Sequence, residues 1–407
     1  MSKAIHLRAS DLVGFSRLAN DGVAGVTDLV KAVHGEIAAT AGAIGHSPSQ
    51  ELTAGITALV YHSIRGVTGL IGDSLLASQR LTPATDEERV SQGREAVVAA
   101  VNGVLGDHLV RTNNPLAISM RLRRHGRPLE TARSALHKTM RQPTGQVLLL
   151  IHGLCLDDLQ WKRKGHDHGA SLARDLRYTP VYLHYNSGLH VSENGQCLAS
   201  LLEQLVEQWP VPVEEITIIG HSMGGLVARS ALHYGMRDKG TQNGLHWTTL
   251  LRKLIFLGTP HHGASLERLG NWVDTALEIS AFSAPFARVG KIRSAGITDM
   301  RHGYVTDEDW KGRDRFADDK DARSPLPLPG SVQCFAIAAT RQESDRCGPD
   351  LLGDGLVTVD SALGRHANPE MSLKLDEAHQ WVGYGMNHWD LLSDASVYKQ
   401  LRRWLSS

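Results

Sequence analysis

One short segment constrains the fold of this chain more than any other, because it joins a strand to a helix through a turn rich in glycine. An apolar run at 215–220 leads into Gly220-His221-Ser222-Met223-Gly224, and a helical pattern follows from Met223 to His233. The serine of such a turn sits on strained backbone, and a side chain at either glycine would collide with neighbouring backbone. The segment therefore predicts a serine hydroxyl exposed above a parallel sheet, at the N-terminus of a helix.

From residue 146 onward, short apolar runs alternate with helical stretches, which is typical of a parallel α/β sheet. The predicted strands are Gln146–Ile151, Pro180–Tyr185, Glu215–Gly220, Lys253–Leu257, Val332–Ile337 and Gln380–Tyr384. Amphipathic helices are expected within about 264–310, inserted after the fourth run as a lid. The sequence thus predicts an α/β fold with a mainly parallel sheet and a helical insertion.

The first 110 residues have a different character, because small apolar residues recur there at helical spacing. All 8 Trp lie at or after Trp161, and Phe15 and Tyr61 are the only Phe, Tyr or Trp residues before residue 146. The last of three helical stripes runs from Val90 to Leu109. We interpret 1–110 as an all-α N-terminal region packed on a larger partner; the alternative is a surface element that handles acyl chains or membrane.

A basic segment at 111–145 follows and is interpreted as a linker. Between Arg111 and Arg141, 8 basic residues stand against one acidic residue, Glu130. Such a run is usually a solvated surface, and we favour that interpretation. The alternative is a peripheral membrane contact through 111–141, since each basic residue near an anionic lipid surface contributes about 1 kcal/mol. The remaining 146–407 would form the α/β domain.

Composition excludes several classes of protein. Lys+Arg and Asp+Glu both number 43, which argues against a nucleic-acid binder. The chain contains no apolar run of membrane-spanning length, and its first residues lack the apolar core of a signal peptide. The cysteines fit neither zinc spacing nor a disulfide framework; they are Cys155, Cys197, Cys334 and Cys347. We therefore expect a cytoplasmic protein, with peripheral membrane association as the alternative; the oligomeric state stays open.

A nucleophilic serine needs a base, and the base needs an orienting carboxylate. The turn at Ser222 resembles that of the α/β hydrolases, and this resemblance implies the chain order Ser, then Asp or Glu, then His. Asp354 follows the fifth predicted strand in a turn flanked by Gly353 and Gly355, and His388 follows the last strand. The sequence therefore predicts the triad Ser222, Asp354 and His388.

Other residues compete for these roles. Asp360 lies near Asp354 but in a stretch typical of a strand or helix start, so Asp354 is preferred on turn chemistry. His366 precedes the last predicted strand and His379 abuts its start. Both would therefore lie at the wrong end of the sheet.

Two backbone N–H groups should bind the oxyanion of an acyl-transfer intermediate. One is predicted at Met223, directly after the nucleophile, and the other at Leu154, in the loop His152-Gly153-Leu154 after the first predicted strand. We expect His152 to shape this loop rather than act as the base. Residues 185–190 follow the next strand at the edge where open α/β sheets bind ligands, and are interpreted as a wall of the substrate pocket.

Five segments together resemble the lipase/esterase branch of the α/β-hydrolase superfamily: Leu150–Leu154, Gly220–Gly225, Leu257–Gly263, Gly353–Val357 and Asn387–Leu391. The closest sets are bacterial triacylglycerol lipases and hydrolases similar to GPI inositol-deacylase. The resemblance covers 146–407 and implies an α/β-hydrolase core with a lid. Some such lipases carry calcium near the histidine, with an Asp at the spacing of Asp390. Because no partner acid is evident, no metal is assigned.

The resemblance and the predicted triad imply a serine ester hydrolase that cleaves acyl esters, lipidic ones in particular, through an acyl-enzyme intermediate. No cofactor is expected, and the partner would be a small-molecule or lipid ester substrate. One alternative is an acyltransferase or thioesterase using the same triad, since the fold leaves the leaving group open. An alternative of another class is a non-catalytic membrane- or protein-binding module.

Overall fold

The computed structural model describes residues 8, 10–18, 20–21, 92–140, 142–237, 244–264, 294–313, 321, 323–344 and 353–406. Most of the lid expected at about 264–310 lies outside the described residues, as do the first two helical stripes of the N-terminal region.

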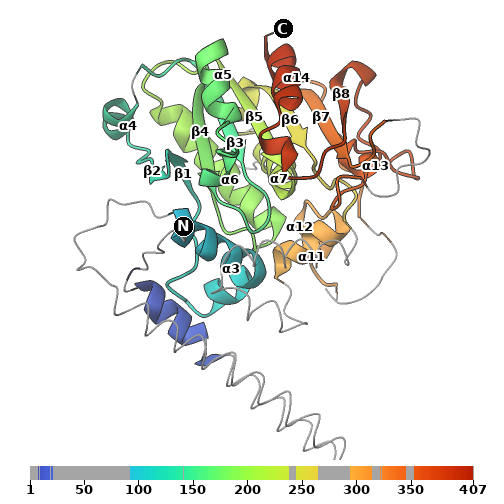
Figure 1. Ribbon diagram of the computed structural model, residues 1–407. Helices are drawn as coiled ribbons and strands as arrows, with labels where there is room; N and C mark the ends of the chain where they lie inside the picture. Colours follow the sequence, from blue (N-terminus) through green and yellow to red (C-terminus); the bar gives the residue numbers. More distant parts are fainter. Residues whose placement is uncertain are drawn as a thin grey trace, which may run out of the picture.

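Eight strands form one sheet in the order β2-β1-β4-β3-β5-β6-β7-β8 (Figure 1). Their bounds are β1 Arg121–Arg124, β2 Arg127–Pro128, β3 Gln146–Ile151, β4 Thr179–His184, β5 Glu215–His221, β6 Leu251–Leu257, β7 Gln333–Thr340 and β8 Gln380–Tyr384. Strands β3 to β8 run parallel, while β1 pairs antiparallel with β4 and β2. All six predicted strands form, and the predicted α/β fold class is confirmed.

Helices cover both faces of this sheet (Figure 1). The helices bounded within the described residues include α3 Gln92–Arg111, α4 Arg133–Thr139, α5 His168–Leu176, α6 Val191–Gln208, α7 Met223–Met236, α8 Trp247–Leu250, α11 Ala295–His302, α12 Asp307–Trp310, α13 Val359–Ala362 and α14 Ala395–Leu405, with 3-10 turns η1 Asp158–Trp161, η3 Glu377–His379 and η4 Asp390–Leu392. Among the helices that the structure describes, none is both long enough and apolar enough to cross a membrane.

Strand β3 shows why the sequences of the parallel strands are continuous apolar runs. Val147, Leu149 and Ile151 point into the larger core, which contains residues of α6 and α7. Leu148 and Leu150 point into a second core, formed with α5 and α14. Because both faces are buried, successive side chains are apolar rather than alternating with polar ones.

Helix α3 belongs to the larger core of the α/β domain. Val97, Val101, Val104 and Leu109 are buried in the same cluster as the inward residues of β3. In Figure 1, α3 lies beside α11 below the sheet. The helix predicted from the third stripe therefore forms, and it packs directly on the α/β domain.

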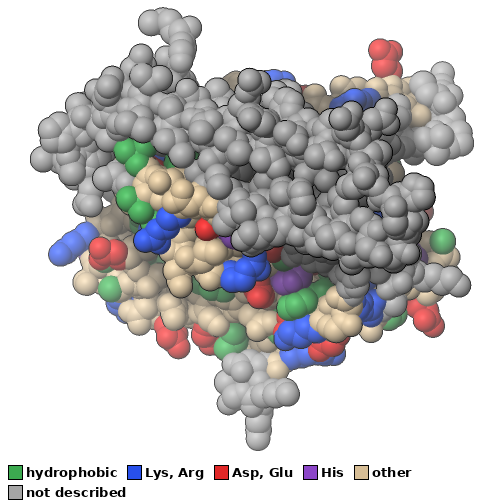
Figure 2. Space-filling view, turned by 90° about the horizontal axis from the view of Figure 1, so that it is seen from below, with side chains coloured by type: hydrophobic (Ala, Val, Ile, Leu, Met, Phe, Trp, Pro, Cys, Tyr) green, Lys and Arg blue, Asp and Glu red, His purple; other side chains and the backbone are tan. Residues whose placement is uncertain are grey.

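The basic segment differs from a plain linker, because its residues 121–128 supply β1 and β2. Arg123 is buried, and its Nη1 donates to Glu95 Oε2 at 2.6 Å and to Asp158 Oδ1 at 3.1 Å. Its charge is therefore neutralised inside the fold and is not part of a solvated surface. Figure 2 views the molecule from below, and among the described side chains on the face it shows, Lys and Arg lie interspersed with Asp and Glu.

Candidate active site

Ser222 occupies a strained turn between β5 and α7. Its backbone has φ 55° and ψ −125°, a conformation that residues other than glycine rarely adopt. A Cβ atom on Gly220 would lie 2.6 Å from Gly225 Cα, and one on Gly224 would lie 2.7 Å from the carbonyl oxygen of His152. Neither position has room for a side chain, so the two glycines let the turn pack tightly against its neighbours.

His388 and Asp354 form a buried pair beside this turn. Nδ1 of His388 lies 2.6 Å from Oδ2 of Asp354. The other carboxylate oxygen accepts the N–H groups of Leu356 at 2.9 Å and Val357 at 2.8 Å. Because a carboxylate can only accept here, the proton of neutral His388 is held on Nδ1, which leaves Nε2 as the basic nitrogen.

The loops carrying Ser222 and His388 meet at one edge of the sheet. The N–H of Ser222 donates to Leu257 O at 2.8 Å, and a Cβ on the next residue, Gly258, would lie 3.0 Å from His388 Cε1. Nε2 of His221 donates to His388 O at 3.2 Å. The structure thus gathers the predicted nucleophile, acid and base in the loops that follow β5, β7 and β8, beside the end of β6.

The loop after β3 lies directly over Ser222. A Cβ on Gly153 would lie 2.9 Å from Ser222 Cβ. Leu154 and Met223 are both fully buried, one in this loop and one directly after the nucleophile. The structure therefore brings the two segments with the predicted oxyanion-binding amides together at Ser222.

His152 has the structural role expected from the sequence. Its Nδ1 donates to Gly153 O at 2.9 Å, and Tyr185 Oη donates to His152 O at 2.9 Å. The Tyr185 ring also stacks on the imidazole, with 4.4 Å between centroids. Burial lowers the pKa of His152 to about 3, so the ring stays neutral near pH 7. With so low a pKa the ring is a weak base, and its contacts with Gly153 and Tyr185 hold the loop in place.

The competing residues lie elsewhere. The side chain of Asp360 is 74% exposed and faces Arg365 at 3.7 Å. The His379 ring packs on Phe335, with 4.2 Å between centroids. Both side chains thus have their partners outside the loop that carries Ser222.

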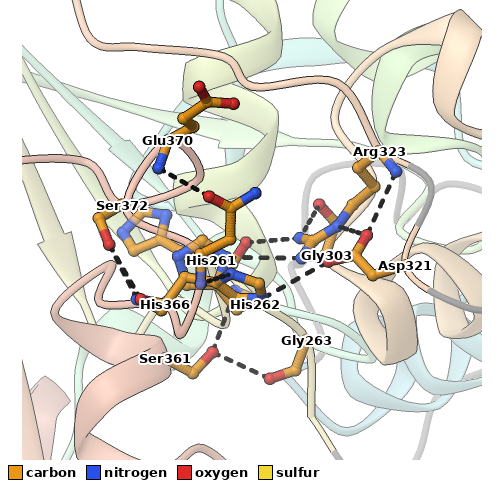
Figure 3. Close-up of polar contacts among 11 residues, drawn as sticks. His261, His262, Gly263, Gly303, Asp321, Arg323, Ser361, His366, Glu370 and Ser372 are labelled. Atoms are coloured by element: carbon orange, nitrogen blue, oxygen red, sulfur yellow. Dashed lines mark hydrogen bonds and ion pairs between the residues drawn. The ribbon is translucent and has the colours of Figure 1, made fainter.

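His366 belongs to a polar cluster of its own, together with His261, His262, Asp321, Arg323 and Ser361 (Figure 3). In this cluster Ser361 Oγ accepts the N–H of His262 at 3.1 Å and donates to Gly263 O at 2.9 Å. Nη1 of Arg323 donates to His261 O at 3.0 Å. These three contacts all end on backbone atoms of residues 261–263, so this part of the cluster fixes the loop after β6.

Asp390 does not have the surroundings of a calcium ligand. Its Oδ1 accepts Lys164 Nζ at 2.8 Å, and its Oδ2 accepts the N–H of Asn387 at 3.1 Å. A cation and an amide thus already use both oxygens, whereas calcium needs several free ones. Within the described part of the chain, no group of three His, Cys, Asp or Glu side chains could hold a metal ion.

Two supporting residues were not assigned from the sequence. His221 holds the backbone of His388, and its position inside the Gly-x-Ser-x-Gly pattern was the available signal. Ser187 accepts the N–H of Cys155 at 3.0 Å with its Oγ. It lies within the 185–190 stretch interpreted as a pocket wall, but its target could be identified only once the two loops were placed in space.

Comparison with known families agrees with this fold. Residues 142–324 match the family described as the PGAP1-like alpha/beta domain. No curated protein matches the chain. The family match confirms the resemblance to α/β hydrolases that the sequence motifs indicated.

Several solved structures are similar to this chain. Mature lipase BlEst2 of Bacillus licheniformis is 15% identical with a TM-score of 0.41, and the match covers 70% of this chain and 98% of that one. Lipase B of Aspergillus fumigatus is 13% identical with a TM-score of 0.40, covering 69% and 59%. A thermophilic esterase from Thermogutta terrifontis is 15% identical with a TM-score of 0.37, covering 65% and 91%.

Proposed function

We propose that this α/β hydrolase is a serine ester hydrolase that cleaves acyl esters through an acyl-enzyme intermediate. The observation that carries the proposal is the buried 2.6 Å contact between His388 Nδ1 and Asp354 Oδ2, beside the strained turn of Ser222. A base held in one tautomer next to an activated serine is the arrangement that nucleophilic acyl transfer requires.

In the first half-reaction, Nε2 of His388 takes the proton of Ser222 Oγ while this oxygen attacks the ester carbonyl carbon. The carbonyl oxygen becomes an oxyanion, which accepts hydrogen bonds from the N–H groups of Leu154 and Met223. When the tetrahedral intermediate collapses, the ester C–O bond breaks and His388 donates its proton to the leaving alcohol. The acyl group remains on Ser222 as an ester.

In the second half-reaction, His388 takes a proton from a water molecule that attacks the acyl-enzyme. The same two amides bind the second oxyanion, and His388 returns the proton to Ser222 as the acid leaves. Throughout, the buried Asp354 carboxylate stabilises the imidazolium form of His388.

The substrate class is proposed as lipidic acyl esters, on the strength of the apolar helical pattern at 264–310. The proposed setting is the cytoplasm, with a peripheral membrane contact through 111–141 as the alternative. Since Arg123 is buried and paired, that contact would depend on the exposed basic residues of the segment, such as Arg121 and Arg127.

Hydrolysis of p-nitrophenyl esters of increasing acyl length tests the proposal. Ser222→Ala should lower kcat by about a millionfold, because nucleophile and base act as one unit. Lipidic specificity predicts that kcat/KM rises with chain length. Product analysis with added alcohols separates hydrolysis from acyl transfer. Wild-type turnover by folded Ser222→Ala would contradict the proposal.

A further inference from the structure

We propose that Ser187 and the glycine-bearing side of α3, Gly103 and Gly106, position the oxyanion-binding amide of Leu154. This inference rests on the proposed function, and it gives the N-terminal helix a part in the reaction although it supplies no reacting atom. We call Ser187, Gly103 and Gly106 together the α3 support.

Ser187 fixes the oxyanion loop from outside. Its Oγ accepts the N–H of Cys155 at 3.0 Å, and the serine is only 1% exposed. Cys155 has φ 61°, a left-handed conformation that is unfavourable for a residue with a side chain. The bonded amide lies in the peptide that directly follows Leu154. Holding that peptide in a strained conformation also fixes the direction of the Leu154 backbone.

Helix α3 presses on the same loop through Gly103. A Cβ at this position would lie 2.9 Å from both the backbone nitrogen and the Cα of Cys155. Glycine is unfavourable in the middle of a helix, so its presence there needs a structural reason. The reason is the close approach of helix backbone to loop backbone, which leaves the oxyanion loop no room to move toward α3.

The loop that carries Ser187 is held by α3 as well. Nδ2 of the buried Asn186 donates to Gly106 O at 3.1 Å. A Cβ on Gly188 would lie 2.7 Å from the Gly106 nitrogen. One side of α3 therefore contacts both the oxyanion loop and the loop that hydrogen-bonds to it.

The expected consequence is confined to the transition state. Removing one oxyanion donor typically lowers kcat about 100- to 1,000-fold, and displacing a catalytic group by about 1 Å can cost about 100-fold. A ground-state ester carries no oxyanion, so its binding should be unaffected. Loosening the α3 support should therefore lower kcat and leave KM nearly unchanged.

The test measures ester hydrolysis by the full chain carrying Ser187→Ala or Gly103→Ala. We expect kcat to fall about tenfold for Ser187→Ala and about 100-fold for Gly103→Ala, with KM within about twofold of wild type. Affinity for a trifluoromethyl ketone, which forms an oxyanion adduct with the serine, should fall by the same factor as kcat/KM.

Two matched variants control for general destabilisation. Thr179→Val also removes a buried hydroxyl that accepts a backbone N–H, that of Thr144 at 2.8 Å, at the start of β4 and so at the opposite edge of the sheet from Ser222. Gly235→Ala also adds a methyl group to a helix, where its Cβ would lie 2.9 Å from the Trp247 and Thr248 side chains. Both lie outside the oxyanion loop, so they should lower stability while kcat of the folded enzyme stays at the wild-type level.

The possible outcomes distinguish the two proposals. If Ser222→Ala is inactive but Ser187→Ala and Gly103→Ala keep wild-type kcat, the positioning role is wrong and the proposed function stands. The positioning role is equally wrong if the two variants lose activity only in proportion to their unfolded fraction. If Ser222→Ala turns over at the wild-type rate, both proposals are wrong.

Discussion

Two buried histidine–aspartate pairs in the described residues differ in the charged groups that surround them. In the first, His388 Nδ1 lies 2.6 Å from Asp354, whose other oxygen accepts two backbone N–H groups. In the second, His184 Nδ1 lies 3.4 Å from Asp158, and the same Asp158 oxygen also accepts the Arg123 guanidinium at 3.1 Å. The two pairs share residue types and burial but differ in the cation beside the carboxylate.

This difference is consistent with the proposed catalytic role of the first pair and with a stabilising role for the second. Burial works to raise the pKa of Asp158, but His184 and the charge of Arg123 hold it below its usual value. Burial lowers the pKa of His184. The second carboxylate is thus already compensated by an arginine, whereas the charge of Asp354 is available to stabilise an imidazolium.

Replacing each histidine in turn should give the largest difference in kcat between the two pairs. His388→Ala should lower kcat by about a millionfold, because the base acts as a unit with the nucleophile. His184→Ala should leave kcat at the same order of magnitude, since its ring takes no part in proton transfer. Steady-state ester hydrolysis measures both, with circular dichroism to verify folding. Equal losses in the two variants would contradict the distinction.

The carboxylates should separate in the same direction with a smaller effect. Asp354→Asn should lower kcat about ten-thousandfold, because the amide favours the wrong tautomer of His388. Asp158→Asn leaves that tautomer unchanged and should mainly lower stability. Comparing kcat with the urea midpoint for both variants checks this, and a fall in kcat of Asp158→Asn as large as that of Asp354→Asn would refute it.

Arg123→Met tests how much the second pair contributes to the stability of the fold. It leaves the buried carboxylates of Glu95 and Asp158 without their shared guanidinium, which should cost about 3–5 kcal/mol of unfolding free energy. Arg127→Met, at an exposed position of β2, should change it by about 0.5 kcal/mol at most. Urea denaturation measures both, and similar values for the two variants would show that the buried pairing is unimportant.

Acid sensitivity should come from buried neutral histidines such as His168, whose Nε2 donates to Leu391 O at 3.0 Å. Burial lowers its pKa to about 4. Between pH 6.5 and 4 the unfolded chain therefore binds one more proton, so stability falls by about 1.4 kcal/mol per pH unit as the pH drops. His168→Gln should reduce the slope of unfolding free energy against pH by about that amount; an unchanged slope would rule out this histidine as a source.

The parallel strands could be predicted because burial on both faces leaves continuous apolar runs, as in β3 and β5. Strands β1 and β2 could not, since Arg121, Arg123 and Arg124 are typical of a solvated segment. Arg123 is buried because it pairs with Glu95 and Asp158, which are distant in sequence. No local pattern reveals such a partner.

The candidate triad was accessible from the order of turns along the chain, because the C-terminal ends of parallel strands share one edge of the sheet. The contributions of Gly103 and Ser187 were not. They depend on how closely α3 and two loops approach each other, which appears only in three dimensions. The small side chains of the first third indicated close helix packing, but not that the oxyanion loop was the partner.

Labelling with a fluorophosphonate probe, followed by mass-spectrometric mapping of the adduct, shows whether Ser222 is the nucleophile and whether His388 activates it. We expect a single covalent adduct on Ser222, lost in His388→Ala and retained in His366→Ala. Equal labelling of wild type and Ser222→Ala, or an adduct on another serine, would contradict the role of Ser222.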